Sequence, residues 1–403
     1  MFAGGLFDIL YIAVKEKKMD RDMQRGSDLN RCILYFFIYC PLGSLCPLIG
    51  QYLSSIGFSG TQVGIITSLG TGAAILAGLL WGKIYANIDK KRWLIISMCM
   101  AAAGLGLLSS TTAVFAAFAL IYSMMYAFQG PVYGLTDSFV ISKSNNFPVI
   151  RATGAAGYAV AAFAVGKLAG SSGLVNIFYI YAAAFMITAI LMIRESDPPV
   201  YREKTKKIKM GRLMRDKKFV KLLICAFLLT GTSVANNTYF SYLFIEGGGT
   251  IAGVGMAFLL MTGSEAPMMA LAPWLSRKIG IERLILICGV IMVGRFALYA
   301  SGPGYGILLG TFFLQGISQG VILVEIVRYF NKIVPPEMSG MAISVYYALG
   351  NNLSVIVCSF MGGIALDLTG ARGVYVFFAL INAGGVILYW LMGMYRDEGR
   401  AEA

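Results

Sequence analysis

The chain has 403 residues, of which 58% are hydrophobic and 13% are charged. A soluble domain of this size cannot keep so apolar a composition in water, so the sequence predicts a protein whose solvent is lipid. The net charge of +13 would suit a nucleic acid only if a folded soluble domain carried a basic face. Because no such domain fits this composition, we expect no nucleic-acid partner.

Residues 1–14 form an apolar run that lacks the basic start and the cleavage site of a signal peptide and is interrupted by Asp8. We interpret residues 1–29 as a cytoplasmic N-terminal segment, and an interfacial segment is the alternative interpretation of the apolar run. Met19 and Met23, just before the first long apolar run, are alternative translation starts.

Twelve longer apolar runs follow, and most are close to the 20 residues or so that cross a bilayer as a helix. Six precede a polar stretch and six follow it. They span 32–53, 63–82, 93–110, 113–141, 149–170, 173–193, 219–244, 251–275, 283–300, 305–330, 339–366 and 373–394. The pattern predicts an all-α integral membrane protein with about twelve transmembrane helices in two pseudo-symmetric six-helix bundles, at 30–193 and 219–396.

The polar stretch at 194–218 separates the two predicted bundles. It contains Asp197-Pro198-Pro199, which ends the sixth helix, and then many Lys and Arg residues. We interpret it as a basic cytoplasmic linker that helps to set topology, and binding of anionic lipid headgroups is the alternative.

Lys and Arg also recur in every second connection between the apolar runs, and the other connections carry almost none. The basic connections contain Lys83, Lys90–Arg92, Lys143, Arg151, Arg277, Lys278, Arg283, Arg328 and Lys332. Basic residues are retained on the cytoplasmic side. We therefore predict a multi-pass protein of the cytoplasmic (plasma) membrane, with both termini in the cytoplasm, including a tail at 397–403.

The seven cysteines all lie inside apolar runs without CxxC spacing, and the chain has no His. Thiols in such runs behave as small buried hydrophobes. The sequence therefore predicts no metal site and no cofactor, and the absence of His excludes the usual base of a Ser or Cys triad. We do not expect an enzyme.

The loops after the second and eighth apolar runs resemble each other. Four matched pairs share one offset of 193 residues without a gap: Trp81 with Trp274, Ile88 with Ile281, Asp89 with Glu282 and Lys90 with Arg283. Such a match in equivalent loops is what a parallel repeat of two six-helix halves predicts, and chance is the alternative for so few residues.

The whole chain resembles the major facilitator superfamily. The segment Gly82–Arg92 is similar to that superfamily's Gly-x-x-x-Asp-Arg-x-Gly-Arg-Arg motif, and Gly82, Asp89, Lys90 and Arg92 are the candidate residues of its cytoplasmic gate. Ala86 stands where the motif has Asp. The resemblance implies a charge-pair latch between the halves that is weakened or moved to Asp89.

Several ionisable residues lie inside the predicted spans, where each is costly and therefore a functional candidate. Glu265 stands mid-span beside Gly263 and Pro267, and Arg295 lies near the middle of the next span. We expect these two side chains to pair, either functionally or as a structural ion pair. The full set is Asp137, Arg151, Glu265, Arg295, Glu325 and Arg328.

These residues narrow the resemblance to the lactose permease branch and its neighbours, the sugar, nucleoside and phenylpropionate proton symporters. The run from Asn146 to Tyr158 is similar to that branch's fifth helix, which implies that Arg151, Gly154 and Tyr158 line the solute site. Glu265 resembles the eighth-helix Glu that binds solute, and Arg295 resembles the ninth-helix Arg that assists proton release.

The sequence also departs from that branch. Gln315 and Ser318 replace its tenth-helix His and Glu, and Asn237 and Asn351 replace an ion pair, which would require neutral hydrogen bonding instead. Glu325 lies two turns beyond the missing acid, and Asp137 lies about one turn from the expected fourth-helix acid. The resemblance implies a solute site that includes Asn237, Gln315 and Asn351, and proton coupling through Glu265, Arg295, Asp137 and Glu325.

From these residues we expect a monomeric secondary transporter that moves a small polar, ring-bearing solute of the sugar or nucleoside class by alternating access, with H⁺ as partner. Two alternatives stay open. One is an exporter of amphipathic compounds on the same fold, and the other is a membrane receptor or assembly factor that transports nothing.

Overall fold

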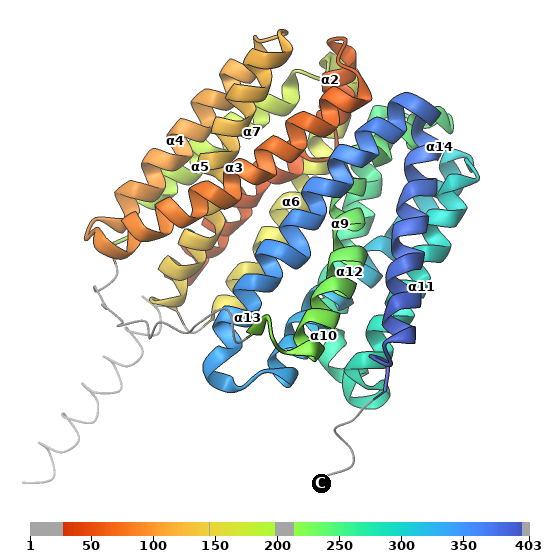
Figure 1. The fold of residues 1–403 in the computed structure, drawn as a ribbon. Coiled ribbons are helices and arrows are strands. Elements are labelled where there is room, and N and C mark those ends of the chain that lie inside the picture. The colour runs from red at the N-terminus through yellow and green to blue at the C-terminus, as the bar shows by residue number, and fades with distance from the viewer. Residues whose placement is uncertain (1–26, 145, 198–212, 397–403) are drawn as a thin grey trace, which may run out of the picture.

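The computed structural model describes residues 27–144, 146–197 and 213–396. Most of the predicted N-terminal segment, much of the linker and the tail lie outside these residues. Within the described ranges the regular structure is helical throughout (Figure 1).

The first half begins with a bent pair of helices, Ser27–Leu45 and α2 (Ile49–Ser55), which meet at 41°. A capping box at Ser59 and Gln62 then opens the next helix, because the two side chains satisfy each other's backbone N–H groups. The remaining helices are α3 (Gly60–Asn87), α4 (Lys91–Ser110), α5 (Phe115–Ile141), α6 (Phe147–Ser172) and α7 (Asn176–Ile193).

The second half begins where Asp216 caps the first helix by accepting from two backbone N–H groups. Its last helical run is broken at Gly370, where φ is 72° and ψ is −173°, a conformation essentially open to glycine alone. The helices are α9 (Lys217–Glu246), α10 (Ile251–Ile279), α11 (Ile281–Ala300), α12 (Tyr305–Ile333), α13 (Ser339–Val345), a π-helix (Tyr346–Asn352) and α14 (Leu353–Leu391).

Nine described helices are long and apolar enough to cross a membrane, or ten if the bent first pair is one span. One of them, Pro336–Leu391, comprises two spans because of the break at Gly370. With α11, a further 20-residue helix, the described residues therefore supply twelve crossings. The predicted all-α membrane fold is confirmed.

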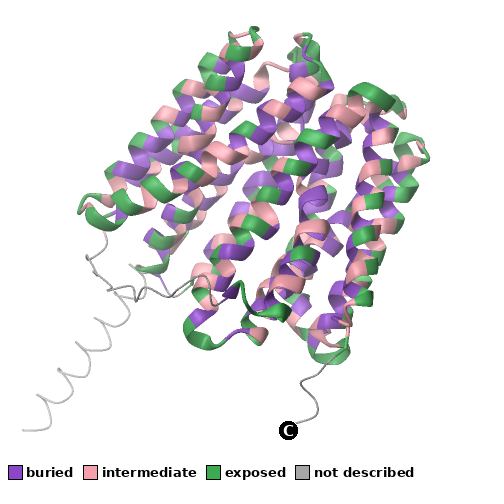
Figure 2. Ribbon diagram, viewed as in Figure 1, coloured by how far each residue is buried: buried purple, intermediate pink, exposed green. Residues whose placement is uncertain are grey.

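The outer surface of the helices is apolar, as lipid requires. Leu79, Leu120 and Leu380 are each 64–66% exposed, and exposed residues run along the outer sides of the helices in Figure 2. Leu on a soluble surface at this density would cause aggregation. In a bilayer the same side chains contact acyl chains.

The two halves touch mainly through two helix pairs, α3 with α14 and α6 with α10, with smaller contacts of α2 with α9 and of α3 with the π-helix. We call the end of the molecule that carries residues 194–197 and 213–216 the linker end and the opposite one the far end. The contacts gather at the far end, where Asp367 of α14 accepts hydrogen bonds from the backbone N–H groups of Gly60 (2.5 Å) and Thr61 (2.7 Å) at the start of α3. A carboxylate of one half thus caps a helix of the other.

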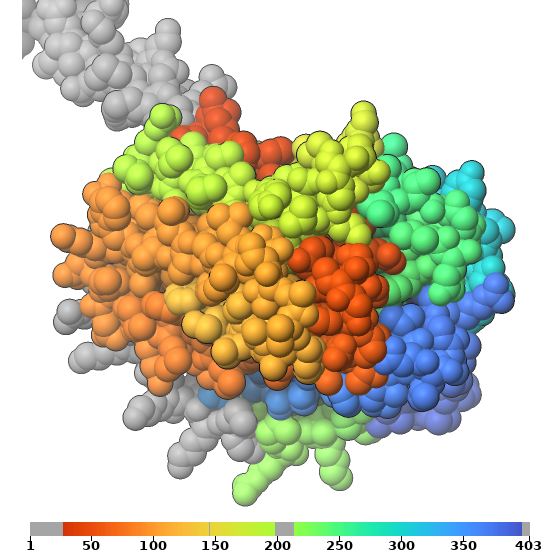
Figure 3. Space-filling view, turned by 90° about the horizontal axis from the view of Figure 1, so that it is seen from above, coloured from red at the N-terminus to blue at the C-terminus, as the bar shows by residue number. Residues whose placement is uncertain are grey.

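Glycine permits this contact. A Cβ on Gly64 of α3 would lie 2.7 Å from the carbonyl oxygen of Ser359 in α14, which is closer than atoms can pack. At the linker end the lower parts of α3 and α13 lie apart (Figure 1). Seen from the far end, the halves meet without a hollow between them (Figure 3). The structure is therefore closed at the far end.

We predict that Gly64→Val weakens closure of the far end, because the added carbons overlap the α14 backbone at a cost of about 1–3 kcal/mol. Spin labels at Ser55 and Leu368, in a cysteine-free background, should show a longer distance population in this variant. Gly78→Val is the matched control, since it lies on the same helix and its Cβ would have no neighbour within 4 Å. Equal distance distributions in both variants would contradict the prediction.

Candidate functional site

Arg151 lies in the first turns of α6 and faces a group of tyrosines and one acid. Its Nε lies 3.7 Å from Oδ1 of Asp137 on α5, and its guanidinium lies 4.3 Å above the ring of Tyr39. The hydroxyl of Tyr35 donates to the same carboxylate oxygen at 2.7 Å. The Arg151 side chain is 42% exposed, so its charged guanidinium is partly accessible while it lies over the Tyr39 ring.

Gly154 makes room for the Tyr39 ring. A Cβ at this position would lie 2.5 Å from the Tyr39 ring, so only glycine lets the ring lie against α6 one turn beyond Arg151. Tyr158 follows one turn further, and its buried hydroxyl has no hydrogen-bond partner among the described residues. A buried donor without a partner is costly, and a bound solute would supply one.

Glu265 lies on α10, the helix that packs against α6 across the two halves. Its carboxylate has no hydrogen-bond or ion-pair partner in the described part of the chain, and Arg151 is the cation that acts on it electrostatically. Its backbone packs closely on α12, since a Cβ on Gly320 would lie 2.7 Å from the Glu265 carbonyl oxygen. The structure therefore brings Glu265 to the same side as Arg151.

Gln315, on α12, is fully buried at the centre of a polar network in the second half. Its Oε1 accepts from Asn236 Nδ2 (2.6 Å) and from Arg295 Nη1 (2.9 Å), and its Nε2 donates to Asn237 Oδ1 (3.1 Å). Tyr375 completes the network by donating to Asn236 Oδ1 at 2.8 Å. One neutral amide thus connects α9, α11 and α12, and Asn236 extends the network to α14.

The expected pairing of Glu265 with Arg295 is wrong. The Arg295 guanidinium bonds to Gln315 and lies over the rings of Phe296 (4.4 Å) and Tyr299 (5.2 Å). The two residues lie on adjacent spans, but the partners of Arg295 come from α11 and α12 and not from α10. Nε and Nη2 of Arg295 are buried without partners among the described residues, so this cation keeps two free donors.

Asn237 and Asn351 do not bond to each other. Asn237 accepts from Gln315, and Asn351, inside the π-helix, donates to Asn352 at 3.2 Å. Asn351 also lines a small interior hollow of about 40 Å³ with Ser233 and Gln319. A π-turn often marks a functional position in a helix, and here it places Asn351 beside the Gln315 network.

Glu325 lies ten residues beyond Gln315, about 15 Å further along the helix. It is fully buried and pairs with Arg328 at 2.8 Å, and Arg328 also donates to Ser276 of α10 at 2.7 Å. The structure thus leaves Glu325 outside both groups described above. Its ion pair ties α12 to the end of α10.

The gate-motif residues lie at the linker end and bond only within their own half. The backbone N–H of Arg92 donates to Asp197 Oδ1 at 2.7 Å, and its guanidinium donates to the Glu195 carbonyl at 2.8 Å. Asp89 and Lys90 are exposed, and a Cβ on Gly82 would meet nothing within 4 Å. The latch expected at Asp89 is not formed in this conformation, in which the linker ends of α3 and α13 lie apart (Figure 1).

Sequence reasoning missed four members of these groups: Tyr35, Tyr39, Asn236 and Tyr375. Aromatic residues are abundant in membrane helices, and the sequence does not show which of their side chains point toward the site. Asn236 stands next to Asn237, and only the helix rotation shows that the first is buried and the second half-exposed. The sequence offered one signal, a polar residue within an apolar run, and Asn236 carries that signal as clearly as Asn237 does.

Comparison with known proteins gives a consistent answer for the whole chain. The family model described as MFS_1 like family matches residues 29–377. A maltose permease of Geobacillus stearothermophilus is 31% identical over 89% of this chain and 93% of its own, and the nucleoside permease NupG of Escherichia coli is 22% identical over 85% and 88%. A crystal structure of the nucleoside transporter NupG superposes with a TM-score of 0.83 at 18% identity, over 92% of this chain and all of that one.

We predict that Gln315→Leu lowers stability by about 3 kcal/mol, because Arg295, Asn236 and Asn237 lose a shared partner in a buried site. The thermal unfolding midpoint of purified protein in detergent should fall clearly. Gln319→Leu is the control, since Gln319 takes part only in a long 3.4 Å bond. Equal midpoints for the two variants would show that the network does not stabilise the fold.

Proposed function

This chain belongs to the MFS_1 like family of the major facilitator superfamily and is a membrane transporter, and we propose that it imports a small sugar together with a proton. The observation that carries the proposal is the unpaired carboxylate of Glu265, which faces the Arg151 group across the boundary between the halves. A charge left unpaired inside a membrane protein is costly and marks a solute or proton path.

The Arg151 group suits a sugar ring. Sugars present apolar ring faces and many hydroxyl groups, so their sites combine an aromatic surface with a few fixed donors and acceptors. Tyr39 supplies the surface, Arg151 the donors and Glu265 an acceptor, while the Tyr158 hydroxyl is free to bond. The higher identity to a maltose permease than to a nucleoside permease favours a sugar over a nucleoside.

On the opposite side of the site we assign solute contacts to Asn237 and Asn351, and a positioning role to Gln315. Gln315 is saturated by protein partners, so its role is to orient Asn237 and Arg295. The two free donors of Arg295 are available to a solute hydroxyl or to Glu265 in another conformation. The site thus draws on both halves, as alternating access requires.

Proton coupling is assigned to Glu265 and Asp137. Asp137 is held by Tyr35 and Arg151, whereas Glu265 has only distant compensation. When Arg151 turns from Asp137 to the solute or to Glu265, the proton moves between the two acids and the cytoplasm. Arg295 assists by approaching Glu265, and we assign Glu325 a structural role instead because of its ion pair with Arg328.

The direction of opening follows from the basic connections. If the linker end is cytoplasmic, as the Lys and Arg distribution predicts, the conformation described here is closed to the outside and is the one that releases solute into the cell. Closing of the linker end would bring the Gly82–Arg92 segment toward the second half and would be the point at which Asp89 acts. We propose the cytoplasmic membrane as the location of the protein on the same distribution of Lys and Arg.

We predict that Arg151→Gln weakens sugar binding by about 10- to 100-fold, because hydrogen bonds from a charged donor contribute about 1.5–3 kcal/mol each. Calorimetric titration of purified protein with maltose measures the change. Lys167→Gln, an exposed residue near the far end of the same helix, should leave binding unaltered. An unchanged Kd for the Arg151 variant would remove this residue from the site.

We predict that Glu265→Gln abolishes uphill uptake of labelled maltose driven by a pH gradient in proteoliposomes but retains downhill exchange of the same sugar. A glutamine keeps the shape and hydrogen bonding but cannot carry the proton. Glu337→Gln, which removes an exposed acid of the linker end, is the control.

Three outcomes count against the assignment. Full gradient-driven uptake by the Glu265 variant would exclude this acid as the coupling group. Efflux of amphipathic compounds in place of sugar uptake would favour an exporter. No transport by the native protein, with cellular function retained after Glu265→Gln, would favour a receptor.

A further inference from the structure

A second hollow lies at the linker end of the second half, away from the proposed sugar site. It has a volume of about 460 Å³ and is lined by Ser276, Arg277, Ile279, Gly280, Arg283, Tyr395 and Arg396. Three of these seven residues are arginines and none is an acid. The volume exceeds what a water molecule or a single ion needs and lies in the range of small-ligand sites.

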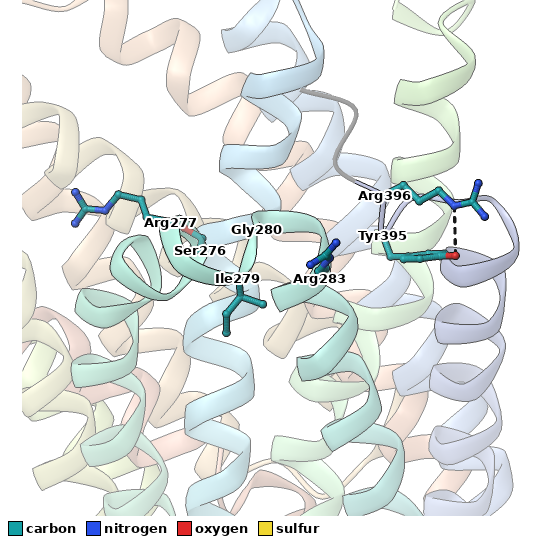
Figure 4. A pocket seen from close by; sticks show the side chains of 7 residues that line it. All are labelled: Ser276, Arg277, Ile279, Gly280, Arg283, Tyr395 and Arg396. Carbon is teal, nitrogen blue, oxygen red and sulfur yellow. Dashed lines mark hydrogen bonds between the residues drawn. The ribbon is translucent and has the colours of Figure 1, made fainter. Parts of the chain in front are cut away.

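The arginines of this hollow lack acidic partners in the described part of the chain. Figure 4 shows Arg277 on one side, Tyr395 and Arg396 on the other, and Arg283 between them. Arg396 Nε donates to the Tyr395 hydroxyl at 3.3 Å, a neutral partner that leaves the charge uncompensated. Arg277 and Arg396 extend toward opposite sides, and Arg283 lies between them (Figure 4).

The α11 helix begins at this hollow and adds to its positive potential. Its cap is Gly280, which offers no side chain to the first backbone N–H groups. The acid of the first turn, Glu282, is 2% exposed and pairs with Lys332 Nζ at 2.7 Å. Lys332 thus compensates the charge of Glu282 through Oε1, while Oε2 lies near Gly280, 3.7 Å from where a Cβ would stand.

The equivalent place in the first half is filled by a protein carboxylate. Lys90 and Arg283 are equivalent in the internal repeat, so the start of α4 corresponds to the start of α11. At α4, Asp197 accepts from the backbone N–H of Arg92 at 2.7 Å and lies 3.4 Å from its Nε. In the second half the described residues that follow the last helix, 392–396, bring no carboxylate to this place, and the acids Asp397 and Glu398 come next in the sequence, outside the described residues.

The hollow lies at the level of the lipid headgroups. Trp274 and Trp390 flank it and are 47% and 55% exposed, and Trp side chains gather at the membrane interface. Lys278 lies 3.9 Å above the Trp274 ring, and the Tyr395 ring stacks on that of Trp390. A ligand in this position is therefore within reach of the bilayer surface.

We propose that this hollow binds an anionic phosphate group, with a phospholipid headgroup such as that of phosphatidylglycerol as its source. Arg283 and Arg396 hold the phosphate oxygens, the N–H groups at the start of α11 add further donors, and Arg277 closes the rim. Arginine suits this role because its planar fork matches phosphate geometry. The bound anion takes the place that Asp197 has in the first half.

Native mass spectrometry of the full chain with defined lipids tests the proposal. The native protein should retain phosphatidylglycerol in preference to phosphatidylcholine. Arg283→Gln with Arg396→Gln should weaken retention of the anionic lipid about tenfold or more, since each direct charge-assisted hydrogen bond to a phosphate oxygen contributes about tenfold. Arg215→Gln with Lys217→Gln removes two exposed charges elsewhere at the same end and should change retention less than twofold.

Two further arms make the result decisive. Arg283→Lys with Arg396→Lys keeps the charge and should recover most of the binding even if the Gln pair lowers folding yield. Glycerol phosphate added in detergent without lipid identifies a soluble phosphate as the source if it binds as tightly as the lipid. Equal losses in the Gln pair and in the control pair, or no preference for anionic lipid at all, would overturn the proposal.

Discussion

An uncompensated charge inside a lipid bilayer is costly, and this cost accounts for how the charged residues of the spans are arranged. Most charges within its spans are matched by a nearby group: Asp137 by Arg151 and Tyr35, and Glu325 by Arg328. Arg295 is held by a neutral amide and two aromatic rings, and Glu265 by distant attraction alone. The charged groups with the fewest partners are the ones to which a solute or a proton can still bind.

The fold was largely predictable because lipid imposes a simple rule on sequence. A bilayer allows few backbone arrangements, so the length and spacing of apolar runs located the helices. The last two runs, at 339–366 and 373–394, are two spans in the structure, but the sequence did not indicate the π-turn at Tyr346–Asn352 or that a single non-helical residue joins the two spans. Hydropathy does not distinguish a π-turn from an α-turn.

The site was predictable in its residue types but not in its pairings. Arg151, Glu265 and Arg295 stood out because ionisable residues are rare in spans, yet sequence could not show that Arg295 bonds to Gln315 instead of to Glu265. Pairing depends on how each helix is rotated about its own axis, and a helix that is apolar on most sides carries little information about that rotation. For the same reason the sequence could not show that Tyr35 and Tyr39 lie beside Arg151.

The break at Gly370 couples the last two spans mechanically. One non-helical glycine joins them, so the two helices form a tight hairpin and neither can shift along its axis without displacing the other. Arg372, two residues past the break, packs its guanidinium against Gly302 in the loop before α12, which ties the tip of this hairpin to the neighbouring loop.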